Sequence, residues 1–188
     1  MKNKQAIIAT LKIKTDEGDF LARYSSAGLA GLDFPAAKSQ RATTAPAGQP
    51  VARWHELTTR AVLQALQGRT MAATPPVDLS CGTPFQRKVW AALQSIPAGK
   101  TETYADLAAS LKKPKAARAV GGACGANPIP LLIPCHRVVA AHGGLGGFSG
   151  GLHWKKKLLG VEQASRLSVL ASRQNIPLGK RHFGGTPK

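Results

Sequence analysis

A cysteine and a histidine stand next to each other at Cys135 and His136, directly after the apolar residues 131–133. We expect the thiol to be buried and rigidly held, with an imidazole one residue away. Burial raises the pKa of a thiol unless a base favours the thiolate, and a histidine can act as that base directly or through one water. The pair therefore predicts a nucleophile. The alternative is an inert core cysteine, the commoner role of a lone buried thiol.

Three short elements are predicted to position this pair. A helix from Thr103 to about 111 has a capping threonine and an aspartate three residues on, and a second helix runs from 115 to about 125. Two short helices across a tight turn predict a helix-turn-helix. The prolines within 127–130 exclude further helix, so 131–133 are predicted to be a buried extended segment that carries Cys135 into the core.

The second helix of this pair consists almost entirely of alanine and glycine, and Arg118 is its one long side chain. Such a helix cannot read base edges in the major groove, but its backbone can approach a narrow surface such as the minor groove, with Arg118 as a wedge in the base stack. The alternative is tight helix packing inside the protein. The lysines at 112, 113 and 115 favour DNA.

The charge of the chain also indicates a polyanionic partner. The 188 residues carry a formal charge of +17. Residues 1–83 hold 10 basic and 6 acidic side chains (+4), and residues 84–188 hold 16 and 3 (+13). We therefore expect the second part to bind a phosphate backbone, although a solvated basic surface without a partner has the same composition.

The amino-terminal part alternates apolar and polar residues over 7–14, 20–24 and 29–34, which predicts a small antiparallel meander. A surface loop is expected at 36–50 and an amphipathic helix at 51–66. The fold class is thus α/β (α+β): an amino-terminal α/β domain (1–80), a linker at 68–82, and a mainly helical domain (83–165). Within the second domain we predict a helix at 84–96, with Thr83 as capping residue and Gln86 three residues on, and another near 152–159. The basic tail 166–188 is expected to be flexible.

Cysteine number and hydropathy limit the class of protein. Three unclustered cysteines do not form a disulfide framework, and residues 1–80 contain no cysteine and only His55, so we expect no zinc or other metal. No apolar run approaches the roughly 20 residues that cross a membrane. We expect a cytoplasmic, intracellular protein with reduced thiols and no membrane association.

The segment Ile133-Pro134-Cys135-His136-Arg137-Val138 resembles the signature of the O6-alkylguanine-DNA alkyltransferases (methylated-DNA–protein-cysteine methyltransferases). Three further motifs have the order and spacing of this family: Arg118-Ala119-Val120-Gly121-Gly122-Ala123, Asn127-Pro128 and Phe148-Ser149-Gly150-Gly151. Several long motifs in register are a specific signal, and the resemblance covers about residues 83–162. It also implies a ribonuclease-H-like amino-terminal domain.

The resemblance implies a role for each matched residue. Cys135 would be the nucleophile and alkyl acceptor, with His136, through a water, and Glu162 as a relay for the thiol proton, and with Asn127 as a buried hinge. Glu162 could instead be a solvated charge at the end of a helix. The base would be bound by Tyr104, Val138, Phe148 and Ser149, and the DNA by Lys115, Ala116, Ala117, Arg118, Gly121 and Gly122. A tyrosine is frequent in the family at the position of Phe148, which leaves the preferred alkyl size open.

The function implied is direct, single-turnover transfer of an alkyl group from O6-alkylguanine, and O4-alkylthymine, in double-stranded DNA to Cys135, by a monomer without a cofactor. One alternative is a non-enzymatic protein that binds alkylated bases and flags them for other repair systems. Another is a cysteine hydrolase, although no oxyanion-hole motif is evident. Cys124 is interpreted as a small residue on the DNA-facing helix, with a redox partnership with Cys135 as the alternative, and Lys155, Lys156 and Lys157 as a solvated face.

Overall fold

The chain opens with three antiparallel strands in a mixed α/β fold. The computed structural model describes residues 5–35 and 49–174. Strands β1 (Ala9–Ile13), β2 (Phe20–Ser25) and β3 (Gly28–Asp33) pair in the order β1-β2-β3, which confirms the predicted meander. Neighbours in sequence pair with each other because turns of two to six residues join them.

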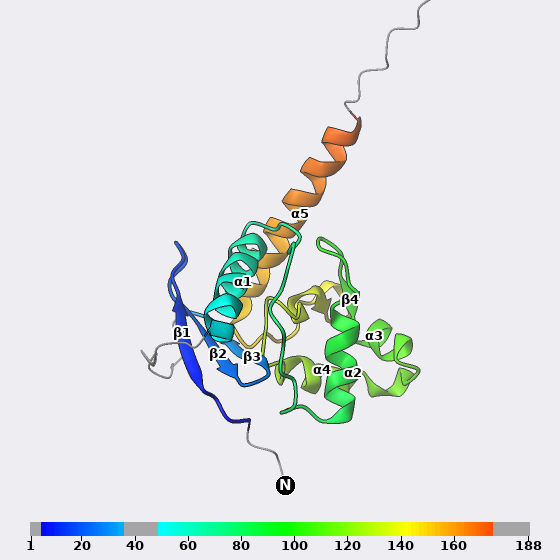
Figure 1. Cartoon of the computed structure of the whole chain (residues 1–188). Helices are drawn as coiled ribbons and strands as arrows, with labels where there is room; N and C mark the ends of the chain where they lie inside the picture. The colour runs from blue at the N-terminus through cyan, green and yellow to red at the C-terminus, as the bar shows by residue number, and fades with distance from the viewer. Residues whose placement is uncertain (1–4, 36–48, 175–188) are drawn as a thin grey trace, which may run out of the picture.

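Helix α1 (Gln49–Leu66) covers one side of this sheet (Figure 1). The predicted helix 51–66 is confirmed and begins two residues earlier, whereas residues 36–48 of the predicted loop lie outside the described part of the chain. The hydroxyl of Tyr24 donates to Thr58 Oγ1 at 2.9 Å and lies 3.1 Å from His55 Nδ1. These buried bonds join strand β2 to α1.

The segment 68–82, predicted as a linker, runs along the edge of β3. Leu29 N donates to Pro76 O and Asp78 N donates to Leu29 O, both at 2.8 Å. The Asp78 carboxylate accepts from Ser25 at 2.5 Å, and hydrogen bonds from Ser25, Ser80 and Gln5 lower its pKa to about 2 although its burial acts in the opposite direction. The segment is therefore fastened to the sheet over part of its length.

Two capped helices follow, as the sequence predicts. Thr83 and Gln86 cap helix α2 (Pro84–Leu93) reciprocally, and Thr103 and Asp106 do the same for α3 (Tyr104–Ser110). Helix α2 ends three residues before the predicted end at 96, because the chain turns there and buries Ile96. Between the helices, β4 (Glu102–Thr103) pairs in parallel with β5 (Val138–Val139).

Helix α4 (Ala117–Gly125) follows α3 after a tight turn and the 3₁₀ turn η1 (Pro114–Ala116), as predicted. The chain turns at Lys112, whose backbone has φ +57°, a conformation that residues other than glycine rarely adopt. Val120 and Ala123 face the core, whereas Arg118 and Gly122 are exposed. The helix is therefore packed on one side only. This contradicts the alternative interpretation of the sequence, in which the small residues serve tight helix packing inside the protein.

The segment that leads to Cys135 is buried, as predicted, but it is not extended. Leu131 has φ +78°, and Pro130 and Ile133 form an isolated β-bridge across a tight turn. The turn delivers Cys135 to η2 (Cys135–Arg137), directly before β5. The sequence failed to show this because a run of apolar residues between prolines fits a buried turn as well as a buried strand.

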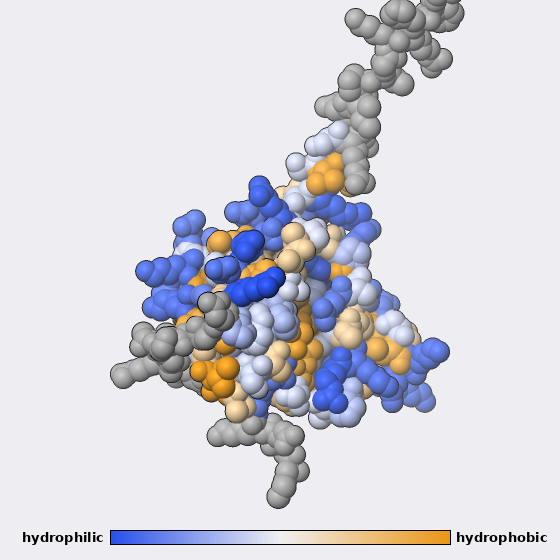
Figure 2. All heavy atoms as spheres, viewed as in Figure 1, coloured by the Kyte–Doolittle hydropathy of each residue, from blue (hydrophilic) through white to orange (hydrophobic). Residues whose placement is uncertain are grey.

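The last helix is much longer than predicted. After the 3₁₀ turn η3 (Ala141–Gly143), α5 spans Leu152–Gln174, so residues 166–174 are helical and do not belong to an unstructured tail. The helix packs against α1 and then projects beyond the body of the molecule (Figure 1), where Leu167, Val169 and Leu170 are exposed. Apolar atoms are visible on this projecting end (Figure 2). Residues 175–188 of the predicted tail lie outside the described residues.

One continuous hydrophobic core joins the amino-terminal and carboxy-terminal parts. Phe34, which follows β3, packs with its ring centroid 4.9 Å from that of Trp154 in α5, and Leu32 N donates to Pro128 O at 2.9 Å. The sheet therefore supports the segment that carries Cys135. Within residues 5–35 and 49–174, no helix is both long enough and apolar enough to span a membrane.

Candidate active site

Cys135 lines a cavity of about 680 Å³, although its side chain is only 4% exposed. A cavity of this size can accommodate a purine base. Its walls come from α3, α4, the turn at Cys135 and the glycine-rich loop before α5. The lining residues are Tyr104, Ala117, Arg118, Gly121, Cys124, Gly125, Cys135, Gly147, Phe148 and Ser149.

Asn127 holds the turn that presents this thiol. Its side-chain amide donates to Ile133 O at 2.8 Å and to Cys135 Sγ at 3.2 Å, and its Oδ1 accepts from Ile129 N at 3.1 Å. Burial raises the pKa of Cys135, whereas the bond from Asn127 and the charge of Lys155 act to lower it. Asn127 therefore fixes the backbone and also favours the thiolate, because its N–H donor is aimed at the sulfur.

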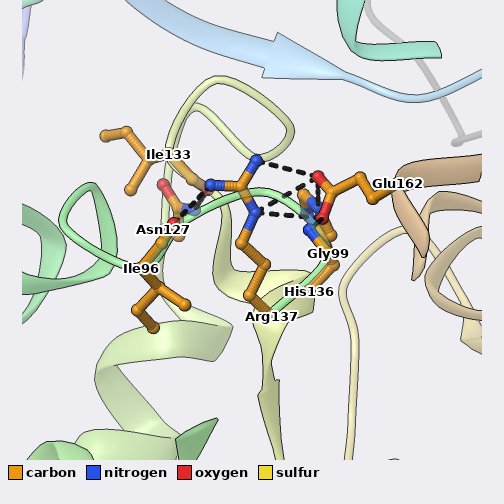
Figure 3. Close-up of polar contacts among 7 residues, drawn as sticks. All are labelled: Ile96, Gly99, Asn127, Ile133, His136, Arg137 and Glu162. Carbon is orange, nitrogen blue, oxygen red and sulfur yellow. Dashed lines mark hydrogen bonds and ion pairs between the residues drawn. The ribbon is translucent and has the colours of Figure 1, made fainter. Parts of the chain in front are cut away.

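Glu162 of α5 connects His136 with Arg137 (Figure 3). Glu162 Oε1 lies 2.9 Å from His136 Nε2 and accepts from the Arg137 guanidinium at 2.8 Å, and Arg137 also donates to Ile96 O at 2.6 Å. Burial alone would raise the pKa of Glu162, but the bonds from His136 and Arg137 lower it to about 2. The carboxylate is 5% exposed, so it is a buried anion and not a solvated charge.

The state of His136 follows from this arrangement. Burial lowers its pKa, although Glu162 opposes the shift. A neutral imidazole whose Nε2–H faces the carboxylate leaves Nδ1 as a proton acceptor. Nδ1 is buried and has no hydrogen-bond partner among the described residues. The His136 imidazole can therefore accept a proton at Nδ1.

Lys155 is completely buried, contrary to the prediction of a solvated face for the three consecutive lysines. Its ammonium donates to Val138 O at 2.6 Å and to Gly147 O at 3.4 Å. Burial lowers the pKa of Lys155, and the neighbouring thiols Cys135 and Cys124 oppose that shift. A buried cation close to Cys135 stabilises the thiolate, because Coulomb attraction is weakly screened away from water.

The other predicted site residues fall into groups. Phe148 and Ser149 line the cavity together with Tyr104, whereas the fully buried Val138 does not line it and contributes its carbonyl to Lys155 instead. Ala117, Arg118 and Gly121 share the cavity wall. Lys115 and Ala116 line a separate shallow surface depression, and a Cβ added at Gly122 would meet no atom within 4 Å.

Cys124 also lines the cavity, so it faces the site and not the exposed side of α4. Burial and the charge of Cys135 raise its pKa to about 12, which keeps this second thiol protonated. Small size therefore remains a sufficient reason for a cysteine here. In the described part of the chain, no group of three or more His, Cys, Asp or Glu side chains could hold a metal ion.

Sequence reasoning did not identify Lys155 or Arg137 as parts of this site. For Lys155 a signal was available: residues 155, 158 and 162 lie on one face of a helix, and Leu158 is an obvious core position. A lysine that shares the buried face is unusual and points to a partner. For Arg137 no such signal exists, because an arginine in a short turn can point in any direction.

The chain is similar to known proteins over most of its length. Residues 84–164 match the family described as 6-O-methylguanine DNA methyltransferase, DNA binding domain. The crystal structure of Mycobacterium tuberculosis OGT in complex with DNA superposes with a TM-score of 0.67 at 32% identity, covering 81% of this chain and 91% of that chain.

Curated relatives match over shorter stretches. The inducible methylated-DNA–protein-cysteine methyltransferase of Bacillus subtilis is 46% identical over 116 residues, which is 62% of each protein. The methylated-DNA–protein-cysteine methyltransferase of Salmonella typhimurium is 56% identical over 78 residues, 42% of this chain and 46% of that protein. The chain therefore aligns with about half of the length of these relatives.

The buried carboxylate predicts a pH-dependent stability. Because the pKa of Glu162 is lowered from 4.5 to about 2 in the folded protein, its ionisation stabilises the fold above pH 4.5, and this stabilisation disappears as the pH falls toward 2. Glu162→Gln should lower the free energy of unfolding by about 3 kcal/mol at pH 7, and the difference from wild type should shrink below pH 4.5. Urea denaturation between pH 7 and 3 measures both effects.

Glu56→Gln is the matched control, since the Glu56 side chain is 71% exposed and its ion pair with Arg60 is long, at 3.9 Å. It should change stability by less than about 0.5 kcal/mol at any pH. An equal loss in both variants, or a difference for Glu162→Gln that does not vary with pH, would contradict the assigned ionisation.

Proposed function

Because the chain belongs to the 6-O-methylguanine DNA methyltransferase family, we propose that it repairs DNA by transferring the alkyl group of O6-alkylguanine to its own Cys135. The observation that carries the proposal is a thiol in the wall of a cavity of about 680 Å³ that the small-residue helix α4 also lines. O4-alkylthymine presents the same kind of activated aryl ether, so we include it as a substrate.

The thiol must first lose its proton. We propose that His136 Nδ1 accepts it through one water molecule, while Glu162 orients the ring from the Nε2 side. Arg137 keeps Glu162 ionised and in place. It acts on His136 only through this carboxylate, so it is a positioning residue. The thiolate, favoured by Asn127 and Lys155, then attacks the alkyl carbon. The bond between that carbon and O6 breaks, its electron pair goes to O6, and guanine takes up the proton that His136 had accepted.

A guanine inside a duplex cannot reach a buried sulfur, so the nucleotide must rotate out of the stack, which costs a few kcal/mol. We propose that α4 lies in the minor groove, because its exposed side carries small residues such as Ala119 and Gly122 around Arg118. Arg118 fills the space left by the base. Lys112, Lys113 and Lys115 are exposed at the preceding turn, where they can contact phosphates. Figure 2 shows hydrophilic side chains on the right-hand side of the molecule, where the turn between α3 and α4 lies.

The base is bound by groups in the cavity wall. We assign the rotated base and its phosphate to Tyr104, and the guanine edge to the main chain near Phe148 and Ser149. Val138 supports the pocket from behind through the bond of its carbonyl to Lys155. Lys115, Ala116, Ala117, Gly121 and Gly122 form the surface that approaches the DNA.

The product is a thioether, which ordinary hydrolysis does not reverse, so each molecule acts once. The reaction as proposed uses no metal or organic cofactor, because an activated aryl ether is exchanged for a stable C–S bond. One copy of the chain contains every group in the scheme, so a monomer suffices. Since transfer needs a reduced thiol and access to DNA, we propose an intracellular, cytoplasmic location.

The direct test is stoichiometric methylation. Purified protein incubated with duplex DNA containing O6-methylguanine should gain one methyl group per molecule on the peptide that carries Cys135, as measured by mass spectrometry. Cys135→Ala should bind the duplex and transfer nothing, while Cys81→Ala, at an exposed thiol outside the cavity, should react as wild type. Tight lesion binding without modification would favour a damage-flagging protein, and turnover of an ester or amide would favour a hydrolase.

The wedge role of Arg118 predicts a substrate-dependent loss. Arg118→Ala should slow transfer from duplex DNA by about tenfold or more, because the side chain no longer offsets the few kcal/mol that unstacking the base costs. The rate with free O6-benzylguanine should stay unchanged, since that substrate needs no unstacking. Arg53→Ala, at an exposed arginine of α1, serves as the control and should change neither rate. Equal slowing with both substrates would refute the wedge.

The buried ammonium predicts a shift of the pH profile. Lys155→Met removes the charge beside Cys135 at similar volume, so the thiol pKa should rise and transfer at pH 7 should slow by about tenfold or more. The rate should recover toward wild type at high pH. The control is Lys156→Met, at the exposed neighbour, with an unchanged profile. A uniform loss of rate across the pH range would argue against the electrostatic role.

A further inference from the structure

We propose that Phe34, a residue of the amino-terminal part, sets the largest alkyl group that the active-site cavity accepts. The inference rests on the proposed alkyl transfer and extends it to substrate size. Phe34 follows β3, is 6% exposed and does not line the active-site cavity. It acts through the residues that do.

Phe34 supports the cavity wall by direct contact. Its ring centroid lies 5.5 Å from that of Phe148, with the ring planes at 70°, and Phe148 lines the cavity beside Cys135. The Phe148 ring also lies 6.3 Å from the His136 ring, with the ring planes at 87°. Phe148 therefore packs on both the His136 imidazole and the amino-terminal part of the chain.

Phe34 itself is firmly anchored. Its ring lies 5.3 Å from Phe20 of β2 and 4.9 Å from Trp154 of α5, centroid to centroid. It also touches the loop after Phe148, since a Cβ added at Gly150 would stand 2.6 Å from Phe34 Cδ2. Rings packed in this way resist displacement, because any shift would open a void in a close-packed core.

The reaction geometry directs the alkyl group toward this wall. Displacement at carbon requires the attacking sulfur, the carbon and the departing O6 to lie close to one line. The remaining atoms of an alkyl group larger than methyl must then project sideways. Gly147, Phe148 and Ser149 form part of the wall of the cavity that Cys135 lines. We assign the sideways projection of larger groups to this part of the wall.

Free space lies behind this wall. A second cavity of about 460 Å³ is lined by Phe34, Asn127, Ser149, Gly150 and His153 among other residues. Ser149 borders both cavities, so the loop separates two spaces. The loop therefore has room to retreat, and the Phe34 ring is the group that blocks the retreat of Phe148. A smaller side chain at position 34 would release it.

The test compares rates of transfer from duplex DNA that contains either O6-benzylguanine or O6-methylguanine. In Phe34→Leu the benzyl-to-methyl rate ratio should rise by about fivefold or more relative to wild type, because Phe148 can move into the space that the Phe34 ring leaves and so widen the pocket. The matched control is Phe85→Leu, the same change in a partly buried phenylalanine of α2. Within the described residues its ring has no aromatic contact with Phe34 or Phe148. Its ratio should stay at the wild-type value.

A second variant acts in the opposite direction. Gly150→Ala places a methyl group against the packed Phe34 ring, which pushes the loop toward the active-site cavity. The benzyl-to-methyl ratio should therefore fall below that of wild type. Urea denaturation verifies that each variant is folded, and Phe34→Met replaces Phe34→Leu, with the same expected rise, if the latter does not fold.

The outcomes separate the two proposals. Wild-type protein that transfers neither group refutes the proposed function, and the inference with it. If wild type transfers methyl groups but folded position-34 and Gly150→Ala variants keep the wild-type ratio, the function stands and the role of Phe34 is overturned. An equal rise in Phe85→Leu also overturns it, since the effect would then come from general loosening of the core.

Discussion

The site depends on one buried carboxylate. Glu162 is 5% exposed and accepts hydrogen bonds from both His136 and Arg137, so its charge is fully compensated only when the turn at Cys135 and α5 are docked together. An uncompensated anion in this position would be strongly destabilising. The docking in turn fixes the imidazole tautomer and orients the ring. The same contacts thus maintain the fold and orient the imidazole that we propose as the proton acceptor.

The amino-terminal part of the chain takes part in the site through packing. None of its described residues lines the active-site cavity, yet Phe34 contacts Phe148, and Leu32 bonds to Pro128, which begins the buried turn before Cys135. Because the two parts share one core, the position of the thiol is set by both. This explains how a small sheet far from the thiol in sequence influences the space around it.

The sequence predicted the elements that depend on local signals. Reciprocal caps at Thr83 and Thr103, the meander and the small-residue helix all follow from residue types at short spacing, and the structure has each of them. The resemblance to a known family indicated Asn127 and Glu162, whose contacts no local pattern could show. Long-range contacts were missed: the burial of Lys155 depends on carbonyls from Val138 and Gly147, and the turn at Leu131 depends on its packing.

Helix α5 carries Lys155 and Glu162 seven residues apart, close to two turns. One rigid helix therefore sets the spacing between the Lys155 ammonium near the sulfur and the Glu162 carboxylate behind the imidazole. Any tilt or slide of that helix changes the surroundings of Cys135 and His136 together, so selection or engineering cannot easily adjust one alone. A minimal scaffold that transplants only the cysteine turn would lack both counter-charges, and a working miniature would have to retain this helix segment in its original register.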